Sequence, residues 1–155
     1  MSFRICGLAA TDFQHLYGLD DAQLAAHGVK RMRVDAHPGY PDRIELRDVA
    51  VGETVLLLNH MHQPADTPYR ASHAIFVREG ATEAAVATDE VPDALRHRTI
   101  SLRAFDADHM MVDADLVEGR ELGGLVEKFF GNPAVAYLQA HYAKRGCYAA
   151  RIERA

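Results

Sequence analysis

The stretch that most constrains this chain runs from Gly52 to Arg78 and reads GETVLLLNHMHQPADTPYRASHAIFVR. It contains two short apolar runs, Val55 to Leu58 and Ala74 to Val77, with a polar loop between them. Short apolar runs bounded by turn residues are typical of buried strands. The loop holds three histidines, His60, His62 and His73, together with Asp66, Tyr69 and Arg70. If the protein binds a ligand or converts a substrate, we therefore expect the site to lie in this stretch.

Length and charge narrow the class of protein. A chain of 155 residues suits one domain, 1–155, with one core. The net charge of −5 is mild, which argues against nucleic acid or an anionic membrane as a partner held by bulk charge. Neither a secretory signal nor an apolar run of roughly 20 residues is present, so we expect a cytoplasmic protein. The two cysteines, Cys6 and Cys147, are then expected to be free, buried thiols.

The first third of the chain alternates between short elements and turns. Residues 3–8 are apolar on both faces and predict a first strand. Capping-box spacing at Thr11 with Gln14 and at Asp20 with Gln23 predicts two short helices. Gly28 is a plausible left-handed cap for the second helix. Residues 29–36 alternate as a strand with one basic face, 37–43 form a loop rich in proline and glycine, and 43–46 read as another strand.

The rest of the chain gives clearer signals. Residues 79–95 are acidic and alanine-rich and predict a surface loop with a short helical turn near 92–95. The runs 99–104 and 110–117 flank turn residues and predict a β-hairpin. Apolar residues at i, i+3, i+4 and i+7 predict a longer helix over 118–130. The segment 134–142 fits a helix or a strand. We favour an α+β fold with a mainly antiparallel sheet of about six to eight strands.

Arg70 is the centre of a candidate anion site. A guanidinium offers a planar fork for carboxylate or phosphate, and neighbouring hydroxyl groups can orient the anion. Pro68 stiffens the loop and so lowers the entropy lost on binding. The residues that we expect to contact the ligand are Tyr69, Arg70, Arg43, Ser72 and His73. Alternatively, Arg70 pairs with Asp66 or Glu45 and simply holds the loop against the sheet.

His60 and His62 are a candidate metal pair. If a strand continues through them, its period of two places both imidazoles on one face. His73, Asp66 or His37 could supply a third ligand for Zn²⁺, Mn²⁺ or Fe²⁺. The plain alternative is a pair of loop-edge histidines with hydrogen bonds and no metal, because a His-x-His spacing arises easily by chance among nine histidines.

Three other kinds of site are disfavoured. Ser72 and His73 are adjacent, so in a strand their side chains point to opposite faces and cannot form a catalytic pair. The aspartates at 106–115 lack the glycine and terminal glutamate of a calcium loop. A phosphate-binding glycine loop is not present either.

Several spaced segments together resemble the bacterial family called domain of unknown function 1203. They are PGYPDR, GETVLLLNHMHQPADTPYRASHAIFVRE, RTISLRAFDADHMMVDADLVEG and GCYAARIER. In that family a proline-cysteine-arginine triplet is common where this chain has Pro41-Asp42-Arg43, and a histidine is common in place of Arg78. A thiol or metal role at those positions therefore does not carry over. The resemblance implies that the tail forms a hairpin, and it implies no activity.

Three functions remain at this point. The first, which we favour, is a binding module for a small anionic metabolite that uses the 66–73 loop. The second is a metal-assisted hydrolase or isomerase centred on His60 and His62. The third is a homo-oligomeric interaction domain, such as a homodimer, without catalysis. The sequence indicates no cofactor and leaves open whether the protein is an enzyme.

Overall fold

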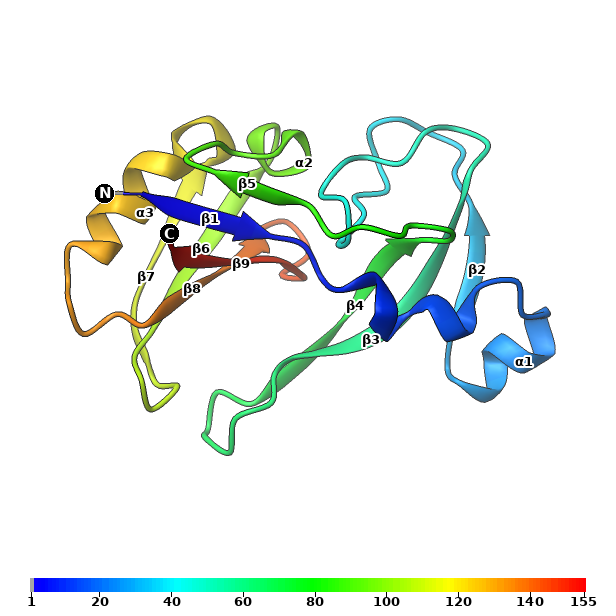
Figure 1. The fold of residues 1–155 in the computed structure, drawn as a ribbon, viewed down its shortest axis with the longest axis horizontal. Coiled ribbons are helices and arrows are strands. Elements are labelled where there is room, and N and C mark those ends of the chain that lie inside the picture. The colour runs from blue at the N-terminus through cyan, green and yellow to red at the C-terminus, as the bar shows by residue number, and fades with distance from the viewer. Residues whose placement is uncertain (1) are drawn as a thin grey trace.

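Two antiparallel sheets carry the fold in the computed structural model, which describes residues 2–155. They lie at opposite ends of the molecule (Figure 1). The six-stranded sheet has the order β5-β1-β9-β8-β6-β7. Its strands are β1 (Phe3–Cys6), β5 (Val86–Thr88), β6 (Thr99–Phe105), β7 (Met111–Glu118), β8 (Tyr137–Tyr142) and β9 (Tyr148–Arg154). The three-stranded sheet has the order β2-β3-β4, formed by β2 (Lys30–Arg33), β3 (Thr54–Gln63) and β4 (Ala71–Arg78).

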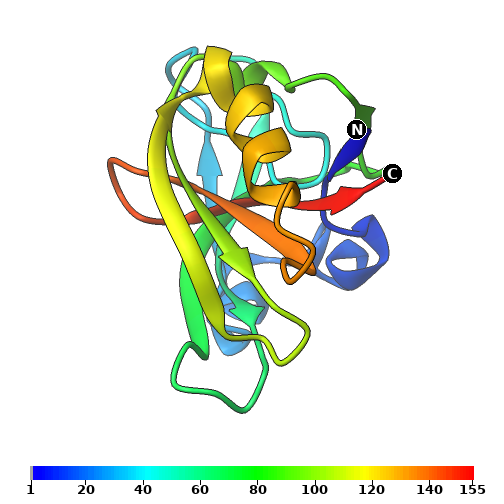
Figure 2. The same cartoon turned by 90° about the vertical axis from the view of Figure 1, so that its left-hand side faces the viewer.

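Short helices cover these sheets. The α-helices are α1 (Asp21–Ala26), α2 (Asp93–Arg96) and α3 (Leu122–Phe130). Three single 3₁₀ turns accompany them, η1 (Ala10–Asp12), η2 (Gln14–Leu16) and η3 (Gly119–Glu121). Helix α3 lies across one face of the six-stranded sheet (Figure 2), whereas α1 lies at the far end of the molecule beside β2 (Figure 1).

The six-stranded sheet is apolar on one face and polar on the other. Leu102 pairs with Ala140 and Ala104 pairs with Leu138, and all four are fully buried in one cluster with Leu122 and Val126 of α3. Because successive strand residues point to opposite faces, the alternate residues turn away from α3. These are Ser101 and Arg103 of β6 and Gln139 and His141 of β8. On this face Ser101 and Arg103 are half-buried, whereas Gln139 and His141 are buried.

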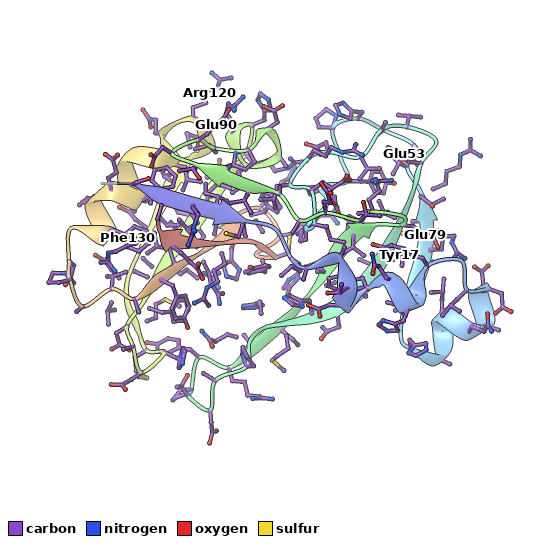
Figure 3. All side chains as sticks on the ribbon, in the orientation of Figure 1. Tyr17, Glu53, Glu79, Glu90, Arg120 and Phe130 are labelled. Carbon is purple, nitrogen blue, oxygen red and sulfur yellow. The ribbon has the colours of Figure 1, made fainter. Side chains whose placement is uncertain are left out.

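The three-stranded sheet is also two-sided. Leu56, Leu58 and Ile75 on one face pack against Phe13, Leu16 and Leu24 of the N-terminal segment. On the other face Leu57 pairs with Phe76, and both are only half-buried. Polar contacts close the outer edge, where Glu79 accepts a hydrogen bond from the Gly18 backbone and Tyr17 donates to the Ala81 carbonyl (Figure 3).

Most of the predicted architecture is confirmed. The fold is α+β, the hairpin β6–β7 and helix α3 lie where predicted, and 134–142 contains a strand that pairs with β9. Asp20 and Gln23 form the predicted capping box, and Gly28 has a φ of 71°, the left-handed conformation expected of it. Cys6 and Cys147 are free thiols, although Cys6 is only half-buried. The part of the chain that the structure describes has no helix that is long and apolar enough to cross a membrane.

Three local predictions were wrong. Residues 43–46 form a turn instead of a strand, because the Asp42 carboxylate accepts a hydrogen bond from the Glu45 backbone at 2.5 Å. Thr11 caps no helix, since the first helical segment is a pair of 3₁₀ turns without a side-chain cap. Strand β5 was missed because its three residues, in an alanine-rich region, pair with β1 through backbone groups alone. The described residues thus form nine strands in two sheets, more than expected.

Candidate functional site

A groove of about 640 Å³ lies between the two sheets, and we call it the basic groove. One wall is the half-buried face of β2, β3 and β4, and the other comes from the start of β6 and the β8–β9 turn, which lies between the sheets in Figure 1. Its cationic lining residues are Arg43, Arg98, Lys144 and Arg145, joined by His73 and His97. None of its lining residues is an aspartate or glutamate. The groove is therefore positive in a protein whose net charge is negative.

Arg43 is the most unusual of these cations. Its side chain is 2% exposed, yet it makes no ion pair with any of residues 2–155. Its guanidinium instead donates to the carbonyls of Tyr148 (2.8 Å) and Pro41 and to Sγ of Cys147 (3.1 Å). Burying a charge without an opposite charge is costly, even where hydrogen bonds compensate in part. An uncompensated guanidinium at a groove wall attracts anions.

A close backbone approach holds the Arg43 segment in place. Leu8 N–H donates to the Arg43 carbonyl, and Arg43 N–H donates to the Phe76 carbonyl. A Cβ atom at Gly7 would lie 2.0 Å from the Ile44 carbonyl oxygen, so only glycine fits there. The Arg43 backbone is thus fixed between the segment that follows β1 and strand β4, which lowers the entropy that the residue would lose on binding a ligand.

Tyr142 lies between two of the cations. The guanidinium carbons of Arg43 and Arg98 are 4.9 Å and 5.2 Å from the centroid of its ring. Arg98 is neutralised by a two-point ion pair with Asp48, with distances of 2.6 Å and 2.9 Å. Burial raises the pKa of Tyr142 to about 12, so the hydroxyl stays protonated. Its Oη is the one buried side-chain nitrogen or oxygen within residues 2–155 that has no hydrogen-bond partner.

The opposite wall of the groove is apolar. Met32, Leu57 and Phe76 line it, from β2, β3 and β4 in turn. Met32 and Phe76 pack against a small cluster formed by Val34, Val49 and Val55. The groove therefore presents cations on one side and hydrocarbon on the other.

The structure places only two of the five predicted anion-binding residues in the basic groove. Arg43 and His73 line the basic groove. Tyr69 and Arg70 lie beyond the groove on the exposed β3–β4 loop, and Ser72 is exposed on β4. Arg70 donates to the Pro64 carbonyl and pairs with neither Asp66 nor Glu45 within 4 Å. A ligand role for these three residues stays a prediction, and the groove does not include them.

His60 and His62 lie on β3, which continues through them as the metal hypothesis required. Both rings contact Tyr148, with centroid distances of 5.5 Å and 5.6 Å. Residues 2–155 contain no group of three or more His, Cys, Asp or Glu side chains arranged to hold a metal ion. The metal site stays a prediction for which the geometry supplies no third ligand.

Most residues of the groove were not predicted from the sequence, among them Arg98, Tyr142, Lys144 and Arg145. Lys144, Arg145 and Gly146 were expected only as part of the hairpin that the family resemblance implies for the tail. Two adjacent cations in a turn beside a buried strand were the signal that could have pointed to an anion site. The position of that turn opposite β4 depends on contacts between distant segments.

Together, these features define the class of protein as a small α+β domain with a preformed basic groove between two antiparallel sheets. The chain belongs to the family described as protein of unknown function (DUF1203), whose model matches residues 39–154. The match includes Arg43, Arg98, Lys144 and Arg145, and excludes β1, α1 and β2. Comparisons with curated proteins and with solved structures gave no match.

Proposed function

We propose that the protein binds a small anionic molecule with an apolar body in the basic groove. The observation that carries the proposal is the lining itself, which has four Arg or Lys side chains and no Asp or Glu. Of the four, Arg98 alone forms an ion pair within residues 2–155. Natural surfaces usually intersperse charges of both signs, so a concave wall of one sign concentrates counter-ions. The volume of about 640 Å³ falls within the range of pockets that hold small molecules.

The two walls indicate the kind of anion. Arg43 keeps further N–H groups beyond the three hydrogen bonds described, and its fork suits carboxylate or phosphate. The Tyr142 hydroxyl offers a neutral donor that has no partner among residues 2–155. Against Met32, Leu57 and Phe76, an apolar ligand body would gain about 25 cal/mol for each Å² of surface removed from water. An amphiphilic carboxylate or phosphate fits both walls better than an inorganic anion.

The test is a titration with straight-chain carboxylates of increasing length and with inorganic phosphate. Ligands of the native state raise its melting temperature. We expect affinity to rise with chain length. The double variant Lys144→Ala, Arg145→Ala should weaken binding of the longest carboxylate about tenfold, because each exposed cation contributes up to about 1 kcal/mol.

The matched control is Arg120→Ala, Lys128→Ala, which removes the same charge from exposed positions outside the groove. The proposal requires the control to bind as the parent does. Equal losses in both double variants would show that only the overall charge matters, and no binding of any anion would end the proposal.

A further inference from the structure

A second cavity, which shares no lining residue with the basic groove, lies where the end of β3 meets the polar face of the six-stranded sheet. Its volume is about 240 Å³, smaller than most pockets for drug-sized ligands. Its polar lining residues are His62, Gln63, His109, Tyr137, Gln139 and Arg151. We call it the histidine pocket.

Gln139 determines which nitrogen of His62 carries the proton. The Gln139 amide N–H donates to the His62 backbone carbonyl at 2.9 Å, which turns its Oε1 toward His62 Nδ1 at 3.0 Å. An amide oxygen accepts only, so Nδ1 is the donor. Burial lowers the pKa of His62, which favours the neutral ring. The neutral ring then has a lone pair on Nε2, and Nε2 makes no hydrogen bond within residues 2–155.

The same reasoning gives His109 the opposite role. Ala65 N–H donates to Oε1 of Gln63, so the Gln63 amide nitrogen donates to Tyr137 Oη at 2.8 Å. The Tyr137 hydroxyl is then free to donate a hydrogen bond to His109 Nδ1, also at 2.8 Å. A neutral His109 consequently carries its proton on Nε2. His109 has a φ of 61°, an unusual conformation for a residue with a side chain, at the turn that brings its ring to Tyr137.

Two arginines lie in this region, and among the described residues only Arg151 is paired with a carboxylate. The Arg151 guanidinium lies 3.9 Å from the centroid of the Tyr137 ring, and its Nε pairs with Glu153 at 2.8 Å. Arg103 is directly opposite Gln139 in the β6–β8 register and is half-buried. Its Nε donates to Ser101, and it makes no ion pair within residues 2–155. Both cations disfavour a ligand that itself carries an ammonium group.

We propose that the histidine pocket is a second binding site, specific for small hydroxycarboxylates. Arg151 binds the carboxylate, His62 Nε2 accepts the hydrogen bond of the hydroxyl, and His109 Nε2–H donates to a ligand oxygen. The pocket thus presents a cation, an acceptor and a donor to a ligand with the complementary groups. Buried Gln63 and Gln139, each 2% exposed, fix both imidazoles before the ligand arrives. The inference does not depend on the function proposed for the basic groove.

Three matched probes test the specificity by calorimetric titration: lactate, propionate and alanine. Propionate lacks the hydroxyl of lactate, and alanine replaces it with an ammonium group. We expect lactate to bind at least tenfold more tightly than either. A pocket that hydrogen-bonds a hydroxyl leaves its own polar group unpaired when the hydroxyl is missing. Equal affinity for lactate and propionate, or no binding of lactate, would overturn the proposal.

Two variants locate the binding. Arg151→Leu should weaken lactate binding at least tenfold, whereas Lys144→Ala in the basic groove should leave it unchanged. The reverse pattern would place lactate in the groove and refute the second site. Because Arg151→Leu could also weaken binding by disturbing the fold, ¹⁵N spectra of the histidine-labelled parent protein test the site without any substitution. These spectra should show His62 protonated on Nδ1 only, with the Nε2 resonance moving as lactate is added. An Nδ1 without a proton, or an Nε2 that lactate does not affect, contradicts the assignment.

Discussion

Two arginine-containing regions of this molecule treat charge in opposite ways. At the outer edge of the three-stranded sheet, Arg31 pairs with Glu79 at 2.7 Å and Arg78 pairs with Glu45 at 2.6 Å. In the basic groove, Arg43 is more deeply buried than either and has no carboxylate partner among the residues that the structure describes. The paired arginines join elements of the fold. Since Arg43 lacks such a partner, it combines a structural role with a capacity to hold an anion.

The backbone around these residues shows why the difference arises. The carboxylate next to Arg43 in sequence, Asp42, is fully buried, and burial raises its pKa. It accepts hydrogen bonds from the backbone N–H groups of Glu45 and Arg78 and forms no ion pair with Arg43. Asp42 therefore shapes the turn and leaves the guanidinium to the groove. Proximity in sequence therefore does not establish charge compensation.

The largest effect is expected for Arg43→Leu. The substitution removes the donors to two buried carbonyls, and each unsatisfied group costs about 1–3 kcal/mol. We expect a loss of about 3 kcal/mol in the free energy of unfolding, measured with urea, together with loss of anion binding. If the variant is as stable as the parent, Arg43 has no structural role.

Helix α3 and the hairpins were predictable because their signals are local. Leu122, Leu125, Val126 and Phe129 repeat with the helical period, and Asp106 to His109 mark a turn between two strands. Each signal is contained within about a dozen residues. The same holds for the capping box at Asp20, whose two hydrogen bonds link residues three apart.

The site was only partly predictable because its residues come from distant segments. Arg43, Arg98 and Lys144 come together through β-sheet pairing, the Gly7 approach and the burial of α3, and no short pattern records these contacts. Pro68, Tyr69 and Arg70 suggested a stiff anion loop, but local stiffness says nothing about where a loop tip projects. His62 was recognised as reactive, whereas Gln139 and Tyr137, which set the roles of the imidazoles, lie in a segment that read equally well as helix.

A smaller effect is expected for Glu79→Gln at the outer edge of the three-stranded sheet, where the arginines have carboxylate partners. The hydrogen bond from Arg31 lowers the pKa of Glu79 from 4.5 to about 2. We expect the variant to lose about 2 kcal/mol of stability at pH 7, allowing for partial solvent screening.

The pH dependence of that loss provides the control. Between pH 4.5 and about 2 the unfolded state of the parent binds more protons at this site, so the contribution of Glu79 is fully present above pH 4.5 and disappears as the pH falls toward 2. Urea denaturation of both proteins across this range should show their stabilities converging. A difference that stays constant with pH would mean that the charge of Glu79 is not what stabilises the edge.

The smallest effects are expected at the β3–β4 loop. This loop is the site that the sequence first suggested, and its residues Tyr69 and Arg70 do not line the groove. Tyr69→Ala removes a side chain that is 37% exposed and contacts Phe105 edge-on, and Arg70→Ala removes a donor to one exposed carbonyl. Each should change stability by no more than about 0.5 kcal/mol. Neither should alter the affinity for the long carboxylate that Lys144→Ala, Arg145→Ala weakens. A tenfold loss of affinity in Arg70→Ala would return the anion site to the loop, since the groove does not include Arg70.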